Sequence, residues 1–403
     1  MNQGWEFKKL GDILIIERGG SPRPIQKYLT NSPDGINWIK ISDATASNKY
    51  IYETKEKITK EGLQKTRIVN EGDFILSNSM SFGRPYIMKT SGCIHDGWLV
   101  LKQNEVKVFD VNFLYYLLSS PFVFNQFDYL AAGSTVRNLN ISLVSSIKVP
   151  LPPLPEQQRI VSILDKVFAA IDKAKANAEQ NLKNARDVFN SYLQGVFEKK
   201  GDGWEHIRMG DICQIYDGTH FSPKNGRDGD YMYITAKNIK PYYIDVSNIS
   251  YVTEDDHNDI YSRCSPKKGD VLYIKDGATA GIATVNTIEE EFSMLSSVAL
   301  IKCSNIILNT FLVHYMNSSV GKKNFLGYLD GAAITRLTLI KIKNVCFSIP
   351  TLEEQQSIVN KLDALRAETQ KLEAIYKKKL DCLEELKKSV LQKAFAGELI
   401  EDV

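Results

Sequence analysis

Two long stretches of the chain carry apolar residues at alternating steps of four and three. One begins at Ile160 and ends near Tyr192, and the other begins at Ile358 and ends near Val390. This spacing, kept over four heptads, predicts two α-helices that pair as a coiled coil. No proline interrupts either stretch, so each helix is expected to extend about 40 residues, or ~60 Å. Polar residues interrupt the apolar face, and we interpret them either as imperfect packing or as residues that fix the register: Asn181, Thr369 and Lys379.

Both helices are preceded by the same motif, Pro-x-Leu-x-Glu-Gln-Gln, at Pro152–Gln158 and again 198 residues later at Pro350–Gln356. Thr351 with Glu354 predicts a capping box, in which each side chain bonds the other's backbone N–H. Pro155 suits the first turn of the other helix. The helix starts are therefore predicted from side-chain chemistry as well as from periodicity.

The segments before the helices contain short β-rich runs separated by turn residues. The runs recur in both halves: Ile13–Ile16, Trp38–Ile41, Phe74–Leu76 and Trp98–Leu101, then Ile212–Tyr216, Tyr231–Thr235, Val271–Ile274 and Val298–Ile301. One helix-like run lies near the end of each half, Val111–Ser119 and Leu308–Asn317. We predict two similar, compact α+β modules of irregular mixed sheets.

A repeat this long is a duplication of whole domains. We predict a first module at 1–150, a first helix at 151–200, a second module at 201–350 and a second helix at 351–403. The second module leaves one helix and enters the other, so an antiparallel pair would hold the two modules at opposite ends, related by a pseudo-twofold axis.

Composition limits the classes of function. The chain has 50 Lys and Arg against 48 Asp and Glu, a net charge of +2. Residues 1–150 carry 18 against 14, and residues 201–350 carry 15 against 17, so bulk charge does not by itself indicate nucleic acid. No apolar stretch approaches the ~20 residues of a membrane span. Six scattered cysteines without a Cys-x-x-Cys pair favour a reduced, cytoplasmic protein.

The chain resembles the specificity subunit of a type I restriction–modification enzyme along its whole length. The resemblance is carried by the helix-start motif, Trp5-Glu6 with Gly11-Asp12, the Gly19-Gly20-Ser21-Pro22 turn, and the pairs Gly72-Asp73 and Gly269-Asp270. The second half departs from the pattern at the turn, where it reads Asp217-Gly218-Thr219-His220.

The resemblance implies a non-catalytic subunit. Each module would be a target recognition domain that reads half of a split, asymmetric site in double-stranded DNA. The helices would space the modules and bind two methyltransferase subunits, through which restriction subunits join. This chain would hold no cofactor or metal: S-adenosylmethionine belongs to the methyltransferase, and ATP and Mg to the restriction subunit.

Base reading requires polar side chains on loops that reach the grooves, and phosphate contacts require cations or small donors. Any one of these residues can also be an ordinary solvated loop residue or turn cap. The candidates in the first half are Arg18, Ser21, Arg23, Lys27, Lys40, Ser42, Ser77, Asn78, Ser81, Arg84 and Arg137. Those in the second half are Thr219, His220, Lys224, Lys237, Asn238, Lys275, Thr279 and Arg336.

Two other classes of function compete with this interpretation. A scaffold whose modules bind proteins or glycans would also suit the near-neutral charge. A metal-dependent nuclease would need Asp34, Glu53 and Lys55 on adjacent strands, whereas Glu53–Lys60 looks like a charged helix or loop without a counterpart in the second half. We interpret Glu254–His257 as a solvated acidic turn rather than a metal site.

Overall fold

The computed structural model describes residues 5–399 apart from 80, 105–106, 133–137 and 328–336. The chain forms two compact units, Met1–Ala178 with Lys378–Val403, and Glu179–Lys377. Each unit contains one α+β module and a part of both long helices. No helix in the described part of the chain is long and apolar enough to cross a membrane.

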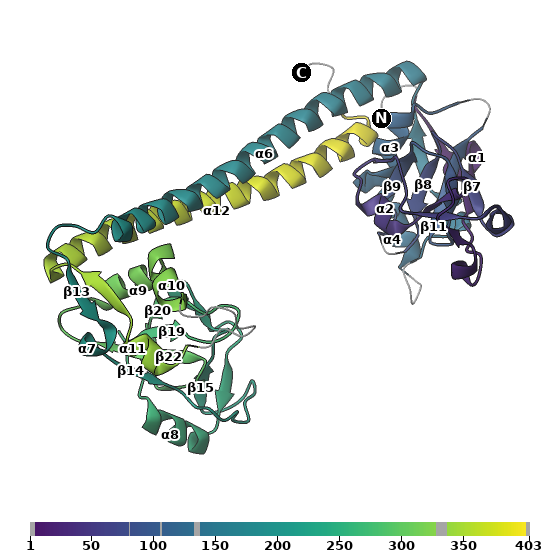
Figure 1. The fold of residues 1–403 in the computed structure, drawn as a ribbon. Helices are drawn as coiled ribbons and strands as arrows, with labels where there is room; N and C mark the ends of the chain where they lie inside the picture. Colours follow the sequence, from purple (N-terminus) through teal and green to yellow (C-terminus); the bar gives the residue numbers. More distant parts are fainter. Residues whose placement is uncertain (1–4, 80, 105–106, 133–137, 328–336, 400–403) are drawn as a thin grey trace. The chain divides into compact units, whose positions relative to one another are not determined.

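The two predicted helices are α6, Leu154–Glu198, and α12, Leu352–Ala396, of 45 residues each. They lie side by side (Figure 1). In the first unit Lys175 pairs with Glu384 at 2.6 Å, and Asp172 with Lys387 at 3.7 Å. In the second unit the ring nitrogen of Trp204, just after α6, donates to Glu354 at the start of α12. Because the end of one helix meets the start of the other, the pair is antiparallel.

The helix-pairing face is narrower than the periodicity predicts. Thr369 is buried, and its hydroxyl donates to the Arg366 carbonyl. Asn181 and Lys379 are exposed and therefore do not occupy a helix–helix seam. Apolar residues that the periodicity assigns to the seam are also exposed, by 42 to 52%: Val188, Tyr192, Leu372 and Leu386.

The first of the two adjacent glutamines in each copy of the repeated motif anchors the helix to its module. Gln157 is fully buried; its amide oxygen accepts from the Asp110 N–H, and its NH₂ donates to the carbonyls of Val108 and Pro152. Gln355 makes the same three bonds to Leu308, Ile306 and Pro350. A buried amide needs all of these partners, which explains why the motif requires glutamine at this position.

The capping box predicted at α12 is half formed. Thr351 Oγ1 accepts the Glu354 N–H at 3.3 Å. The Glu354 carboxylate accepts instead from the Trp204 indole at 3.0 Å. The prediction of a reciprocal pair was wrong because a tertiary donor takes the carboxylate.

The described residues of the first module form three sheets, in the strand orders β1-β12, β3-β6-β4-β10-β7 and β2-β11-β8-β9-β5. Its strands are β1 Glu6–Lys9, β2 Leu14–Arg18, β3 Leu29–Thr30, β4 Ile36–Ile39, β5 Tyr50–Ile51, β6 Glu56–Ile58, β7 Arg67–Val69, β8 Phe74–Ser77, β9 Pro85–Met88, β10 Gly92–Ile94, β11 Trp98–Gln103 and β12 Lys148–Leu151. Its helices are α1 Leu10–Ile13, α2 Ile41–Thr45, α3 Val111–Leu118, α4 Pro121–Ala131 and α5 Ile141–Ser146, with 3₁₀ turns η1 Ile25–Lys27 and η2 Lys60–Lys65.

The second module repeats this plan with the strand orders β13-β23, β14-β22-β19-β20, β18-β15-β21 and β16-β17. Its strands are β13 Glu205–Arg208, β14 Cys213–Asp217, β15 Tyr231–Ile234, β16 Ile239–Lys240, β17 Tyr243–Ile244, β18 Ser250–Val252, β19 Val271–Ile274, β20 Ala283–Val285, β21 Phe292–Met294, β22 Val298–Cys303 and β23 Cys346–Ile349. Its helices are α7 Met209–Ile212, α8 Glu254–Arg263, α9 Asn309–Asn317, α10 Ser319–Leu326 and α11 Leu339–Lys343.

All eight predicted β-rich runs overlap strands, and both helix-like runs are helices, α3 and α9. Two local interpretations were wrong. Within Glu53–Lys60, residues Glu56–Ile58 form strand β6, which pairs between β3 and β4. Glu254–His257 is not a solvated turn but the start of α8: Thr253 caps it, and His257 is 2% exposed and stacks on Tyr231 at 3.7 Å.

Each module packs on its helices through a hydrogen bond at equivalent positions, 198 residues apart. In the first unit the Tyr116 hydroxyl on α3 donates to Asp165 on α6, and Phe168 packs edge-on against Tyr116. In the second unit His314 Nε2 on α9 lies 3.1 Å from Asp363 Oδ1 on α12. The same joint is therefore built with a phenol in one unit and an imidazole in the other.

Candidate nucleic-acid interface

In both modules the polar loops are held by equivalent backbone hydrogen bonds at the ends of strands, and we call this arrangement the strand-end frame. In the first module the Asn78 N–H donates to the Gly97 carbonyl, and the Leu139 N–H donates to the Asn78 carbonyl. In the second module Lys275 makes the same two bonds with Ser297 and Leu337. Asn78 and Lys275 each follow the corresponding strand, β8 or β19, so they are equivalent positions.

The glycine that follows β2 in the first module and β14 in the second is required, because another backbone segment approaches it closely. A Cβ added to Gly19 would lie 2.1 Å from the His95 carbonyl oxygen, and one added to Gly218 would lie 1.9 Å from the Met294 carbonyl oxygen. No side chain fits at those distances from backbone. This is why the turn of the second half, which departs from the first elsewhere, keeps that glycine.

Asp96 is the centre of the polar cluster in the first module. Ser21 Oγ donates to its Oδ1 at 2.7 Å, and Arg23 Nη2 donates to its Oδ2 at 3.2 Å. Its backbone carbonyl accepts from Asn78 Nδ2 at 2.8 Å and from Arg18 Nε at 3.1 Å. The hydrogen bond from Ser21 is the main cause that lowers the pKa of Asp96, so the carboxylate stays ionised. Four candidates from two separate segments therefore converge on one residue.

A cavity of about 620 Å³ adjoins this cluster and is lined by the candidates Ser21, Arg23, Lys40 and Ser42. Its aromatic wall contains Trp38 and His95. Burial lowers the pKa of His95. His95 Nδ1 accepts the Gly97 N–H at 2.9 Å, so the ring is neutral, and its 3.9 Å approach to Asp96 is not an ion pair.

The remaining candidates of the first module differ in what they present to solvent. Lys40 pairs with Glu56 at 2.7 Å, and Arg84 lies 5.2 Å from the Tyr86 ring centre. Lys27 and Ser42 are exposed, and Ser81 is half-buried, with its N–H donating to Ser77 Oγ. Ser77 and Asn78 are buried and hold the loop rather than present donors. Arg137 lies outside the described residues.

The second module surrounds a buried lysine with carboxylates. Lys275, whose side chain is 3% exposed, lies 3.5 Å from Asp217 and 3.1 Å from Asp276. His220 Nε2 lies 3.3 Å from Asp217 on the solvent side, and its side chain is 47% exposed. The candidates Lys275 and His220 are thus brought together through Asp217, but only His220 is accessible.

The other candidates of the second module divide in the same way. Thr219 is buried and accepts the Phe221 N–H, and the buried Asn238 holds a turn through Thr235 and Asp245. Lys224, Lys237 and Thr279 are exposed. Arg336 lies outside the described residues.

Sequence reasoning missed Asp96 and Asp217 as candidates. Asp96 precedes Gly97 and strand β11, a pattern that resembles an ordinary turn. Asp217 was recognised only as part of a divergent turn. A carboxylate whose hydrogen-bond and ion-pair partners lie far along the chain is detectable only when the distant segments are placed. Asp96, for example, lies 75 residues from Ser21.

The nuclease residues do not form a site. Asp34, Glu53 and Lys55 are exposed, with both carboxylates on turns or loops. Among the described residues no group of three or more His, Cys, Asp or Glu is placed to hold a metal ion.

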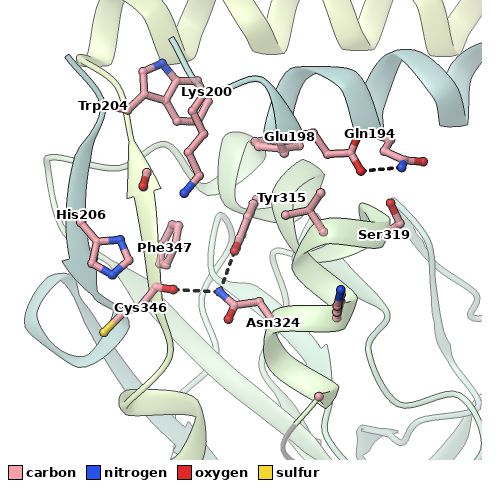
Figure 2. A pocket seen from close by; sticks show the side chains of 15 residues that line it. Gln194, Glu198, Lys200, Trp204, His206, Tyr315, Ser319, Asn324, Cys346 and Phe347 are labelled. Atoms are coloured by element: carbon pink, nitrogen blue, oxygen red, sulfur yellow. Dashed lines mark hydrogen bonds between the residues drawn. The ribbon is translucent and has the colours of Figure 1, made fainter. Parts of the chain in front are cut away.

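A cavity of about 870 Å³ in the second unit lies where α6 ends beside strands β13 and β23 (Figure 2). Asn324 crosses it: its amide donates to the Tyr315 hydroxyl and to the Cys346 carbonyl. Gln126 makes the equivalent bond to the Lys148 carbonyl in the first module. Because the amide is used in the same way in both modules, we assign Asn324 to the fold and not to ligand binding.

Known proteins are similar to this chain over nearly its whole length. The model for the type I restriction modification DNA specificity domain matches twice, at residues 2–183 and 201–380. The MjaVIII specificity subunit of Methanocaldococcus jannaschii is 23% identical over 98% of this chain and 93% of its own length. The EcoBI specificity subunit of Escherichia coli is 24% identical over 92% and 81%.

Solved structures share the fold. A chain from a study of complex assembly and conformational transition of the type I R-M system has a TM-score of 0.78 at 20% identity and covers 99% of both chains. The HsdS subunit of Thermoanaerobacter tengcongensis has a TM-score of 0.60 at 20% identity, over 99% of this chain and 98% of that one.

Proposed function

The chain belongs to the type I restriction modification DNA specificity family, and we propose from this premise that each module reads one half of a split DNA site. The specificity role is itself non-catalytic. One observation supports the proposal best. Both modules gather polar loop side chains at an equivalent strand-end frame, but the side chains themselves differ between the modules. Two polar surfaces that differ in their side chains but share the backbone arrangement suit two different DNA half-sites.

The long helices are proposed to bind the partner subunits. A patch of exposed apolar side chains on a helix is a candidate surface for another protein to cover. On α6 these are Val188 and Tyr192, and on α12 they are Leu372, Ile375 and Leu386, exposed by 42 to 58%. We propose two methyltransferase subunits as the occupants, with restriction subunits joining through them. S-adenosylmethionine would be supplied by the former, and ATP and Mg by the latter.

Linking two short recognitions through helices raises the effective concentration of each for the other. The first test is to map methyladenine in the host genome by long-read sequencing, with and without this gene. Loss of one split, asymmetric motif on deletion is expected. An unchanged methylation map in cells that express an active partner methyltransferase would contradict the proposal.

Exchange of residues 1–150 for those of a relative with another target is the sharper test. One half of the motif should change, and the other half should remain. If both halves changed, the modules would not read independently.

A further inference from the structure

We propose that Arg23 is a specificity-determining residue that reads a guanine in the half-site of the first module, and that Asp96 is its positioning residue. This inference rests on the proposed DNA-reading function and deepens it by naming the base and the side chain. It is drawn from the cluster around Asp96 and from the cavity that adjoins it.

The carboxylate of Asp96 is held in place before any ligand arrives. Ser21 occupies its Oδ1 at 2.7 Å, and its backbone is fixed by Asn78, which is 2% exposed, and by Arg18. The Arg23 side chain is 81% exposed, so without this partner it would sample many rotamers. Asp96 therefore restricts an exposed guanidinium to the rim of the cavity formed with Trp38, Lys40 and His95.

The pairing leaves the guanidinium able to form a fork. Within the described part of the chain, Asp96 is the hydrogen-bond and ion-pair partner of Arg23, and it engages only Nη2. Nη2 carries two N–H groups, one facing Nε and one facing Nη1, and a single bond to Asp96 uses only one of them. The other N–H of Nη2 and that of its neighbouring nitrogen remain as an adjacent pair for a ligand. Two adjacent N–H groups match the O6 and N7 acceptors of guanine in the major groove, the commonest specific contact of arginine with DNA.

Charge favours a base edge over a phosphate. Arg23 and Asp96 together are close to neutral, and a phosphate approaching Arg23 would also approach the ionised carboxylate of Asp96. A guanine edge is uncharged and does not meet this repulsion. Lys27, four residues further on and exposed, has no carboxylate partner among the described residues. It suits the sequence-independent phosphate contact and provides a matched control.

The experiment maps methyladenine in cells that carry the intact system with wild-type chain, Arg23→Lys, Asp96→Asn or Lys27→Ala. Arg23→Lys keeps the charge and loses the fork. We expect one guanine of the first half-site to become degenerate, with a roughly 10- to 100-fold loss of discrimination, while the second half-site is unchanged. Asp96→Asn should relax the same guanine to a smaller extent. Lys27→Ala should lower methylation at all sites without altering the motif.

The outcomes separate the inference from the function on which it rests. If the wild-type chain directs a split motif and Arg23→Lys leaves that motif intact, the guanine-reading role is wrong while the recognition function stands. If only Asp96→Asn leaves it intact, the positioning role is wrong. If Arg23→Lys lowers methylation uniformly, as expected for Lys27→Ala, Arg23 contacts phosphate. If the wild-type chain directs no motif, the proposed function fails first. Hydrogen exchange of each variant chain verifies that β2 and β11 stay folded.

Discussion

At the end of β2 the first module carries Arg18, and at the end of β14, the equivalent strand, the second module carries Asp217. After β8 the first module has Asn78, and after the equivalent strand β19 the second module has Lys275. In the first module the acid that completes the cluster comes from a turn, as Asp96. In the second it comes from the strand end, as Asp217. Each acid lies beside one accessible basic side chain, Arg23 or His220.

The difference between the modules shows which features the fold requires. The backbone bonds of Asn78 and Lys275, the glycine at the strand end and the glutamine at each helix start are kept. The charges attached to this frame differ: Arg18 is matched by Asp217, and the neutral Asn78 is matched by Lys275. Side chains at the strand ends can therefore change with the DNA half-site while the strands and helices remain.

The largest difference expected from this comparison is in stability. Lys275→Ala leaves Asp217 buried without its ammonium, and breaking a buried ion pair costs about 3–5 kcal/mol. Asn78→Ala removes one neutral hydrogen bond, from the Asn78 side chain to the Asp96 carbonyl, at about 1 kcal/mol. Pulse-labelling hydrogen exchange in a urea series, followed on β19 and β8, measures both values separately.

A double variant provides the control for the lysine. Lys275→Met with Asp217→Asn removes both charges, so much of the stability should return. If the double variant were as unstable as Lys275→Ala, packing of the lysine stem and not its charge would be responsible.

A smaller difference is expected from the module–helix joints in acid. Burial is the main cause that lowers the pKa of His314 to about 4. The nearby Asp363 opposes this lowering, and Arg366 adds to it. The Tyr242 ring also contacts the imidazole. The unfolded histidine has a pKa of about 6.5, so between these values the unfolded chain binds more protons. The contribution to stability is complete above pH ~6.5 and is lost as the pH falls toward about 4. Tyr116 in the first unit does not titrate there, because a phenol has a pKa of about 10 and burial raises the pKa of Tyr116 further.

Exchanging the two joint residues tests this assignment. His314→Tyr should flatten the acid-side slope of the second unit, and Tyr116→His should introduce such a slope in the first. The measurement is the urea midpoint of each unit by hydrogen exchange from pH 7 to 4.5, corrected for intrinsic rates. Equal slopes in wild type and His314→Tyr would assign the acid sensitivity to other groups.

Local sequence was sufficient to predict the helices and strands, but it did not predict the polar cluster around Asp96. The four-and-three spacing predicted α6 and α12, and short apolar runs predicted β8, β11, β19 and β22, since these patterns depend on near neighbours. The exposure of Leu372 and Leu386 was not predicted, because periodicity identifies an apolar face but not what covers it.

Burial of polar residues was equally beyond local pattern. Lys275 reads as a solvated strand-end lysine until Asp217, 58 residues earlier, is placed 3.5 Å away. His257 reads as part of an acidic turn until Tyr231 and Ser293 surround it. The helix and strand content was thus predictable, whereas the residues that hold Arg23 and His220 required the tertiary structure.

The smallest effects are expected where the units should not differ, on the helix pair. Arg186 and Glu373 pair at 3.0 Å in the second unit, and Lys175 and Glu384 at 2.6 Å in the first, all partly exposed. Exposed pairs contribute about 0.2–1 kcal/mol, so Arg186→Ala and Lys175→Ala should each lower the stability of their own unit by that amount. Both losses should shrink in 1 M salt, where the Debye length is ~3 Å. A loss above 2 kcal/mol in one unit alone, measured by the same hydrogen exchange, would mean that the helices as well as the strand ends differ between the two halves. The contrast would then no longer be confined to the residues that we propose read DNA.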